Sequence, residues 1–580
     1  MRRVIFLLFC AFYALTMTGQ AQLTVTVDSA GRLAALLPDS IRYTVSELTV
    51  KGDLNGADIR ILQMVSSRTR PKKPTDVLLT ELDLSEANIL ESKGNFRTRA
   101  NNLPAAMFSN CKSLVTVILP NTLEAVSKSC FTGCVNLKEV VLPDELKVID
   151  DYAFNGCVSL TAVNLPNSLE KIENHAFDGC RSLTDLEVPE TVTLIDNYAF
   201  VRCANLERVI IHGSISRVSN SSFAGCERLK HIDLPPSVTY IGNEAFKGCR
   251  SLEAVGMPET ISEIGNNAFD NCTSLKTIEL NTANKIGSEA FLGCTSLTLV
   301  EIDGASKIGS SAFEDCSGLT SVSIDGDLSA IPAETFSGCT SLQTLSLPPS
   351  VKTIGSKAFF ECKSLLTFEL PPSLVKIADH AFENCASMQS ITIPNLVKQI
   401  GSDAFEGCLS LDSVNILGFI EKVENDLFRY CHSLRVVLLP VSVKSIGDNA
   451  FEQCSMLQEI VLPISVNNIG DNAFEKCASL TTVIIPAACT AVGSSAFREC
   501  SALNRLELPA ALKKIGGNAF AKCVSLRDLI CYSPIPPSLA NSTFKGVPLA
   551  ACKVVVPKGA KGSYRNNKAW NKMPQIVEQN

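Results

Sequence analysis

Cysteine is the residue type whose number and spacing first suggest chemistry in this sequence. The 580 residues include 24 cysteines, and 19 of them, the first Cys111 and the last Cys523, follow one another at steps of 22 or 23 residues. Thiols bind metals, form disulfides, or pack as small apolar side chains. The sequence has no C-x-x-C pair of the kind that gathers thiols around zinc, and one thiol per step does not assemble four ligands.

Disulfides remain the alternative to a ladder of buried free thiols. An exported protein permits them. Side chains in one register point in parallel, however, which places their Cβ atoms ~5 Å apart, beyond the ~3.5–4.5 Å that a bridge requires. Cys130, Cys489 and Cys531 also occupy positions that other repeats give to apolar residues. We therefore expect a ladder of buried free thiols.

Histidine and carboxylate side chains offer a second kind of chemistry. We expect His231 and Asp233 to point outward from one strand, and Asp185 and Glu187 to point outward two repeats earlier. Acid–base or metal chemistry needs an enclosed site, and the sequence predicts no pocket around these groups. The motifs G-x-S-x-G and H-E-x-x-H and the P-loop are also absent. We predict that the protein is not an enzyme, with no catalytic residue, no cofactor and no bound metal.

A column of carboxylates is the weaker candidate for a metal site. Asp303-Gly304 and Asp325-Gly326 are turn dipeptides one repeat apart, and further carboxylates lie close by in the repeat at Glu279, Glu301 and Asp327. Oxygen ligands of this kind suit Ca²⁺. Asp-Gly is also ordinary turn chemistry, so both interpretations stay open.

A repeat of 22 or 23 residues accounts for the cysteine spacing. A Phe precedes each of the 19 cysteines by three residues, and a Leu follows all but one of them by three residues. Each unit contains L-x-x-V-x-L, whose alternation predicts a short strand with one buried face. The glycine of the Ile-Gly pair that follows is expected to take a turn conformation closed to residues with a Cβ, and A-F-x-x-C to form a short helical turn. One such coil cannot bury its own apolar residues, so the coils must stack.

The series C-x-S-L, L-x-x-V-x-L and I-G-x-x-A-F-x-x-C resembles the BspA-type leucine-rich repeat of bacterial surface proteins over roughly residues 79–545. The resemblance implies an α/β repeat fold, a leucine-rich repeat solenoid of ~20 coils of 22–23 residues. It has a parallel inner sheet, short helical turns on the outer side, and caps at both ends. Members of the family are typically secreted or surface-attached, and some are adhesins that bind host matrix proteins or other bacteria.

The beginning of the chain predicts export. Arg2 and Arg3 precede an apolar run over residues 4–15, and small residues follow, which is typical of a secretory signal peptide over residues 1–21. The protein is therefore expected outside the cell or at its surface, with the periplasm as the alternative.

The remaining chain divides into three predicted parts. We expect an N-terminal cap over residues 22–78, the solenoid over 79–545 and a C-terminal cap over 546–580. The net charge of −7 argues against a nucleic-acid partner, which requires a basic surface. No segment after the signal peptide has the length and apolarity of a membrane span. The sequence does not predict the oligomeric state.

The exposed strand positions are where a solenoid of this kind would bind a partner. They are apolar in the late repeats, at Val436, Leu438, Val461 and Ile484. Apolar residues in one exposed column indicate a contact surface. The alternative is that β-branched residues occur there because they favour strand formation. We predict a binding protein that contacts a host, neighbouring-cell or envelope protein, in adhesion or another protein–protein interaction. The alternative is a periplasmic or envelope scaffold without a dedicated ligand.

Overall fold

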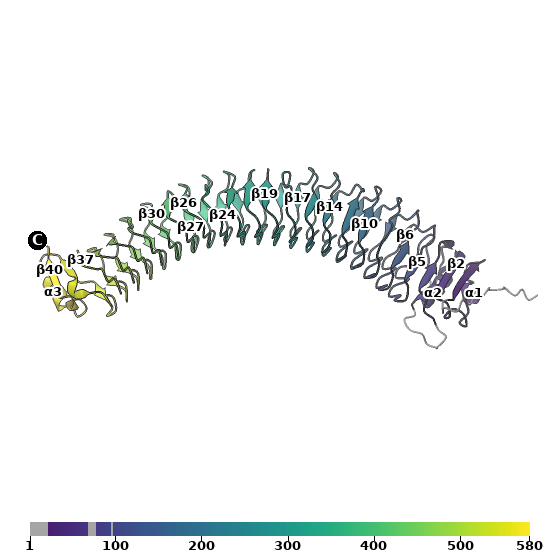
Figure 1. Cartoon of the computed structure of the whole chain (residues 1–580), viewed down its shortest axis with the longest axis horizontal. Helices are drawn as coiled ribbons and strands as arrows, with labels where there is room; N and C mark the ends of the chain where they lie inside the picture. The colour runs from purple at the N-terminus through teal and green to yellow at the C-terminus, as the bar shows by residue number, and fades with distance from the viewer. Residues whose placement is uncertain (1–20, 68–76, 94–96, 580) are drawn as a thin grey trace, which may run out of the picture. The chain divides into compact units, whose positions relative to one another are not determined.

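The computed structural model describes residues 21–67, 77–93 and 97–579. The predicted signal peptide lies outside these residues except for Ala21. Two compact units divide the chain, residues 1–278 and residues 279–580. Parallel strands form a solenoid of about 24 turns with little helix (Figure 1), which confirms the predicted fold class.

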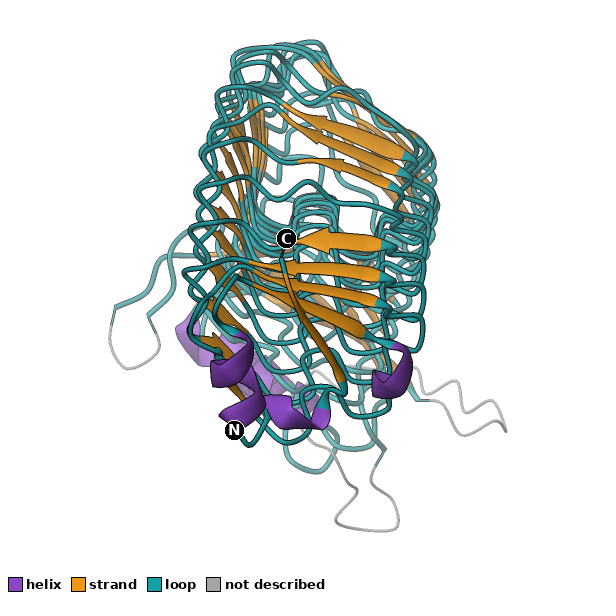
Figure 2. Cartoon of the chain, turned by 90° about the vertical axis from the view of Figure 1, so that its left-hand side faces the viewer, coloured by secondary structure: helices purple, strands orange, loops and turns teal. Residues whose placement is uncertain are grey.

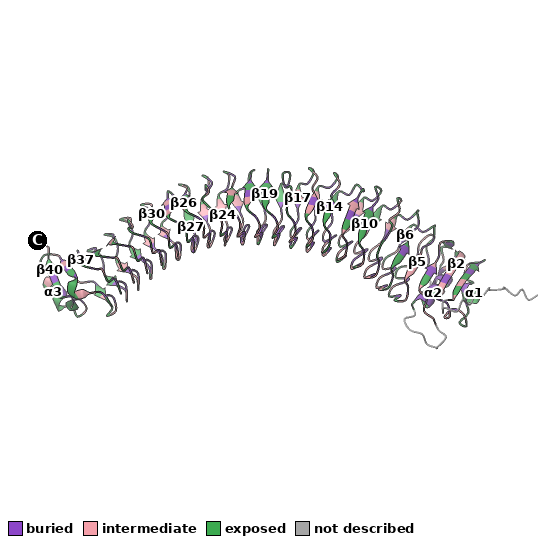
Figure 3. Cartoon of the chain, in the orientation of Figure 1, coloured by how far each residue is buried: buried purple, intermediate pink, exposed green. Residues whose placement is uncertain are grey.

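Most coils of the first unit contribute a short strand to a parallel layer, which we call the strand face. The inward residues of these strands, such as Leu186 and Val209, are buried, and the outward ones are exposed or half-buried (Figure 3). The register advances one coil at a time, since Asp185 pairs with Arg208 and Arg208 with His231. The strands are β5 (Thr116–Ile118), β7 (Glu139–Val141), β10 (Asp185–Val188), β12 (Arg208–Ile211), β14 (His231–Asp233) and β16 (Ala254–Gly256).

A second column of two-residue strands lies at the Ile-Gly position of each coil. Each ends on a buried apolar residue, as at Ile149 and Ile172. In the first unit these strands are β6 (Ala125–Val126), β8 (Val148–Ile149), β9 (Lys171–Ile172), β11 (Leu194–Ile195), β13 (Arg217–Val218), β15 (Tyr240–Ile241) and β17 (Glu263–Ile264). Figure 2 shows both columns in orange.

The second unit repeats the same plan. Its strand face comprises β19 (Leu299–Ile302), β21 (Ser321–Ile324), β23 (Thr344–Ser346), β26 (Ser390–Ile393), β28 (Ser413–Ile416), β30 (Val436–Leu438), β33 (Thr482–Ile484), β35 (Arg505–Leu508) and β37 (Asp528–Cys531). Its second column comprises β18 (Lys285–Ile286), β20 (Lys307–Ile308), β22 (Ala330–Ile331), β24 (Thr353–Ile354), β25 (Lys376–Ile377), β27 (Gln399–Ile400), β29 (Lys422–Val423), β31 (Ser445–Ile446), β32 (Asn468–Ile469), β34 (Ala491–Val492), β36 (Lys514–Ile515) and β38 (Ser538–Leu539).

The interior of each unit is a column of stacked phenylalanine rings beside a column of thiols. Phe131 and Phe154 stack with ring centroids 5.3 Å apart, and Phe382 stacks on Phe405 at 5.4 Å. All 23 cysteines in the described part of the chain are free and buried. The thiol of Cys157, for example, donates a hydrogen bond to the carbonyl oxygen of Phe131 at 3.1 Å. The predicted thiol ladder is therefore confirmed.

The A-F-x-x-C segment differs from its predicted helical turn. In the coil that ends at Cys157, Tyr152 has a φ of 57° and Gly156 a φ of 72°, and left-handed residues at both ends interrupt a helix. The segment is a run of turns closed by bonds such as Cys157 N to Phe154 O, 3.1 Å. Its other N–H groups bond the next coil, as Phe154 N does to Ala176 O at 2.7 Å. The segment thus holds neighbouring coils together.

The prediction for the Ile-Gly glycine was wrong. Gly242 does not have a positive φ, but a Cβ built on it would lie 2.7 Å from the backbone nitrogen of Asn220 in the preceding coil. Glycine is required there because the two backbones pass so close together. The left-handed glycine of the repeat is instead the one directly before the cysteine, such as Gly156.

The N-terminal region, for which we predicted a cap, has longer elements than the coils. β1 (Gln22–Val27) pairs in parallel with β2 (Glu47–Leu54), and β2 pairs with β3 (Glu81–Asp83) and β4 (Ala87–Ile89). The helices are α1 (Leu33–Leu36) and α2 (Gly56–Ser66). Asn55 and Asp58 form a capping box at the start of α2, and the Asp58 carboxylate also accepts hydrogen bonds from Gly31 N and Leu33 N.

The C-terminal region packs aromatic side chains on the last phenylalanine of the repeat. Trp570 is buried with its ring 6.2 Å from that of Phe544, and its Nε1 donates to Pro537 O at 2.9 Å. The elements are η1 (Leu549–Ala551), β39 (Lys553–Val556), α3 (Lys561–Asn566), η2 (Trp570–Lys572) and β40 (Gln575–Glu578). In the described ranges, no helix has the length and apolarity needed to cross a membrane.

Candidate functional site

The four apolar residues predicted to form a contact surface are all exposed in the second unit. Val436 and Leu438 lie on β30 with 48% and 57% of their surface exposed, Val461 reaches 82%, and Ile484 on β33 reaches 58%. They extend over three consecutive coils. The structure therefore places all four on the solvent side of the strand face, as the alternation in L-x-x-V-x-L requires.

Two further residues that the sequence analysis missed enlarge this surface. Val441 and Ile464 directly follow the prolines that end their coils' strand segments, and each is 85% exposed. Ser465 Oγ donates to Val441 O at 2.8 Å, which joins the two turns. The signal was a large apolar residue after Pro440 and Pro463, where the other repeats have a polar residue, Pro or Ala. We call the six residues the apolar patch: Val436, Leu438, Val441, Val461, Ile464 and Ile484.

An interruption of the strand face underlies the apolar patch. Residues 459–462 form no strand, and no backbone hydrogen bond joins them to either neighbouring coil. A groove of about 390 Å³ opens at this point, and its lining includes Val436, Leu438 and Val461 together with Arg435 and Glu459. The apolar patch is thus hollowed rather than flat.

A second interruption lies in the first unit, where the predicted outward carboxylates are found. Asp185 and Glu187 line a groove of about 720 Å³ together with Asn164 and Arg208. The other predicted pair lies two coils further along the chain, where His231 Nε2 is 2.9 Å from Asp233 Oδ1 and both side chains are exposed. Glu187 is bonded to a different histidine, His212, at 3.1 Å.

The five carboxylates of the predicted calcium site are exposed turn and strand residues. Asp325 Oδ1 accepts a hydrogen bond from Gly326 N at 2.7 Å, as in an ordinary turn. Within the described ranges, no three of Glu279, Glu301, Asp303, Asp325 and Asp327 bring carboxylate oxygens within 4.8 Å of one another. Ca²⁺ binding at these residues stays a prediction.

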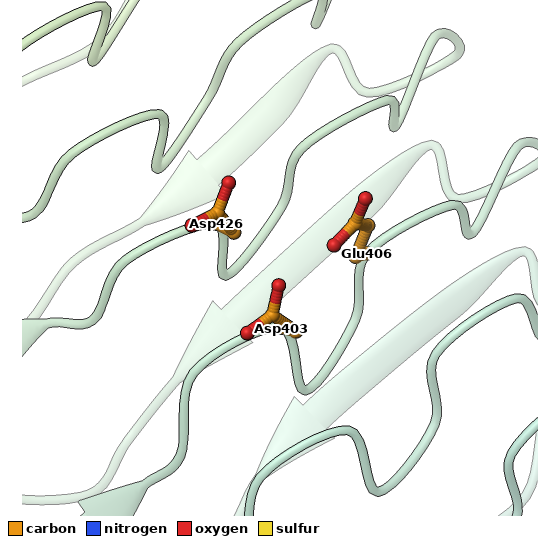
Figure 4. Close-up of side chains that lie close together, drawn as sticks. All are labelled: Asp403, Glu406 and Asp426. Carbon is orange, nitrogen blue, oxygen red and sulfur yellow. The ribbon is translucent and has the colours of Figure 1, made fainter.

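The structure assembles a different acidic group, which the sequence analysis did not identify. Carboxylate oxygens of Asp403, Glu406 and Asp426 lie within 4.8 Å of one another in two neighbouring coils (Figure 4). Arg429 Nη1 lies 3.5 Å from Asp426 Oδ1 and 3.8 Å from Glu406 Oε1, and its Nε donates to Glu452 at 2.9 Å. The group is therefore an ion-pair cluster around one arginine. In the sequence it could have been found from the acidic residues that lie five and two positions before the repeat cysteine.

Burial and mutual repulsion shift the titration of this cluster. Burial, a hydrogen bond with Asp403 and the negative charges of Asp403 and Glu383 raise the pKa of Glu406 to about 8, against the opposing effect of Arg429. Burial also raises the pKa of Asp426. Glu406 therefore keeps its proton at neutral pH.

The dependence of the protein's stability on pH should consequently reflect the titration of Glu406. A carboxyl whose pKa is raised in the folded state stabilises the fold below its ordinary pKa of 4.5, and this contribution is lost as the pH rises through about 8. The melting temperature of the wild type should fall between pH 5 and pH 9 more steeply than that of Glu406→Gln. The exposed Glu301→Gln serves as the control, and parallel curves for wild type and Glu406→Gln would contradict the assignment.

Comparison with known proteins identifies the repeat. The family model described as BspA type leucine rich repeat region matches residues 101–230, 216–333, 306–435 and 421–548. No curated protein matches the chain.

Several solved structures resemble the chain. A leucine-rich repeat protein from Bacteroides ovatus ATCC 8483 is 22% identical, covers 86% of this chain and 92% of its own, and has a TM-score of 0.30. A leucine rich cell surface protein from Faecalibacterium prausnitzii A2-165 is 25% identical over 60% of this chain and 87% of its own, with a TM-score of 0.31. The family model alone spans well over half of the sequence, and the chain belongs to the BspA-type leucine-rich repeat family.

Proposed function

We propose that this protein is exported and binds another protein without catalysis, in adhesion or a related contact at the cell surface, and that the apolar patch on the strand face is where it does so. The observation that carries the proposal is the exposure of the patch. Six large apolar side chains, each about half exposed or more, lie on three consecutive coils, and Val436, Leu438, Val441 and Val461 among them line one groove. Soluble proteins rarely leave such a contiguous apolar surface in water unless a partner covers it.

Strand propensity does not account for the apolar patch. β-branched residues are favoured within strands because they pack well on a pleated surface. Val441, Val461 and Ile464 lie outside every strand and are the three most exposed members of the patch. Nothing in the local backbone therefore favours apolar residues at these three positions, and contact with a partner explains them better.

Charged substitutions in the patch test the proposal. Leu438→Glu combined with Ile484→Glu should leave the fold intact, because both side chains point to solvent, and should weaken partner binding at least tenfold. The measurement is binding of the purified protein to a panel of immobilised matrix proteins and to intact bacteria, with its mass in solution recorded in parallel. Val141→Glu, at the same repeat position on β7 and 43% exposed, is the matched control.

The result also separates the two functions predicted from sequence. Loss of binding in the double variant, with binding kept in Val141→Glu, supports a binding protein that uses the patch. Unchanged binding and unchanged mass in solution would contradict the proposal and favour an envelope scaffold without a dedicated ligand.

A further inference from the structure

The strand face of the first unit is interrupted at Ala162–Leu165. The coil before it contributes β7 and the coil after it contributes β10, and the regular step of 23 residues would pair Ala162 with Glu139 on one side and with Asp185 on the other. No backbone hydrogen bond joins Ala162–Leu165 to either neighbour.

The interruption leaves an open sheet edge on β10. Arg208 N bonds back to Thr184 O, which shows that residues at this repeat position direct their backbone groups to the preceding coil. The equivalent residue on β10 is Asp185, and alternation along a strand gives Glu187 the same direction. Their N–H and C=O groups therefore face Ala162–Leu165 without a backbone partner. Unpaired edges of this kind accept an added strand.

A groove lies along the open edge, between Ala162–Leu165 and β10. Its volume of about 720 Å³ lies in the range of ligand-binding sites, which is ~300–1,000 Å³. β10 is four residues long, which corresponds to roughly 13 Å of extended chain. We call this space the acidic groove, and its dimensions suit a short extended peptide.

The charges that line the acidic groove favour a peptide with cationic side chains. Asp185, Glu187 and Glu190 contribute three carboxylates, against one guanidinium from Arg208 and the imidazole of His212, which is bonded to Glu187. Asp185 and Glu187 are two residues apart on one strand, and both are exposed. Their carboxylates therefore project to the same side of the strand, separated by the length of two extended residues. Cations at every second residue of an extended peptide would match this spacing.

We propose that the acidic groove binds an extended peptide segment with alternating lysine or arginine side chains. The peptide backbone pairs with the open edge of β10, and its cationic side chains contact Asp185, Glu187 and Glu190. This site lies in the first unit and is separate from the apolar patch in the second. Failure of one proposal therefore leaves the other unaffected.

A synthetic peptide tests the site directly. The probe is a fluorescein-labelled Lys-Val-Lys-Val-Lys-Val peptide, and its binding to the protein is measured by fluorescence anisotropy at about 0.15 M salt. Asp185→Asn combined with Glu187→Gln should weaken the affinity at least tenfold, with an unchanged melting temperature as evidence of folding. The matched control is Asp233→Asn combined with Asp528→Asn, at the repeat positions of Glu187 and Asp185 on β14 and β37, which are paired on both sides. It should change the affinity less than twofold.

A second probe separates strand pairing from attraction between charges alone. Methylation of alternate backbone nitrogens of the same peptide removes the N–H donors but keeps every cation, and it should weaken binding by a similar factor. Three results would overturn the proposal. They are failure of the wild type to bind the peptide, equal weakening of binding by the two double variants, and binding of the N-methylated peptide as tight as that of the unmodified one. Equal affinity for free spermidine would overturn it as well, because a polyamine has no backbone to pair.

Discussion

Almost none of the 23 cysteines of residues 22–580 is expected to react with a thiol reagent in the folded protein at pH 8, whereas all 23 should react in guanidinium without reductant. Every one of these side chains is buried and free. Burial raises the pKa of Cys249 and of Cys408 to about 12, so that roughly one such thiol in 10⁴ is a thiolate at pH 8. Thiols of this kind react only when the coil around them opens.

A designed thiol supplies the control for this experiment. Val524 is next to Cys523 in the sequence but 51% exposed, so Val524→Cys should add one immediately reactive thiol and leave the others protected. Rapid reaction of many thiols in the folded wild type would contradict the ladder. A large shortfall from 23 in guanidinium would show that disulfides, the alternative left open by the sequence, are present.

Removal of one ring from the phenylalanine column should have the largest effect on stability. Phe382 is fully buried, with the ring of Phe359 at 5.2 Å on one side and that of Phe405 at 5.4 Å on the other. Phe382→Ala leaves a cavity that stacked coils cannot fill, and such substitutions cost about 3–5 kcal/mol. Because each coil contacts only its neighbours, the loss should be concentrated in the coils around Cys385.

Hydrogen exchange measured by mass spectrometry resolves this local effect. Amides of the coils next to Phe382 should exchange roughly 10²- to 10³-fold faster in Phe382→Ala, since every 1.4 kcal/mol is about a tenfold change. Phe419→Ala is the matched control, because Phe419 is 64% exposed and its removal should change stability by about 0.5 kcal/mol or less. Equal effects of the two variants, or uniform acceleration over the whole chain, would contradict the account.

The sequence predicted the features that every coil repeats. Phe and Cys at fixed positions recur often enough to identify a buried column, and the alternation in L-x-x-V-x-L placed Leu438 and Ile484 on the exposed side. The Ile-Gly prediction failed because the reason for glycine at Gly242 is the distance to Asn220 in another coil. The sequence pattern within one coil does not show how close the backbone of the next coil lies.

The candidate sites depend on departures from the repeat, and these were harder to predict. Residues 160–165 read as a regular L-x-x-V-x-L, yet Ala162–Leu165 does not pair with its neighbours. The interruption is a property of how three coils stack, which one motif does not encode. The residue types of Val441 and Ile464 indicate an apolar surface, but both residues lie outside the strand positions of the repeat.

Photo-crosslinking in a growing culture tests the central claim most directly, namely that the strand face contacts a partner through the apolar patch. p-Benzoylphenylalanine placed at Leu438 should give a discrete adduct with another protein on irradiation. The same group at Val524, which is similarly exposed but follows the cysteine of its coil rather than lying on the strand face, should give none. Absence of an adduct at Leu438, or equal adducts at both positions, would contradict the account.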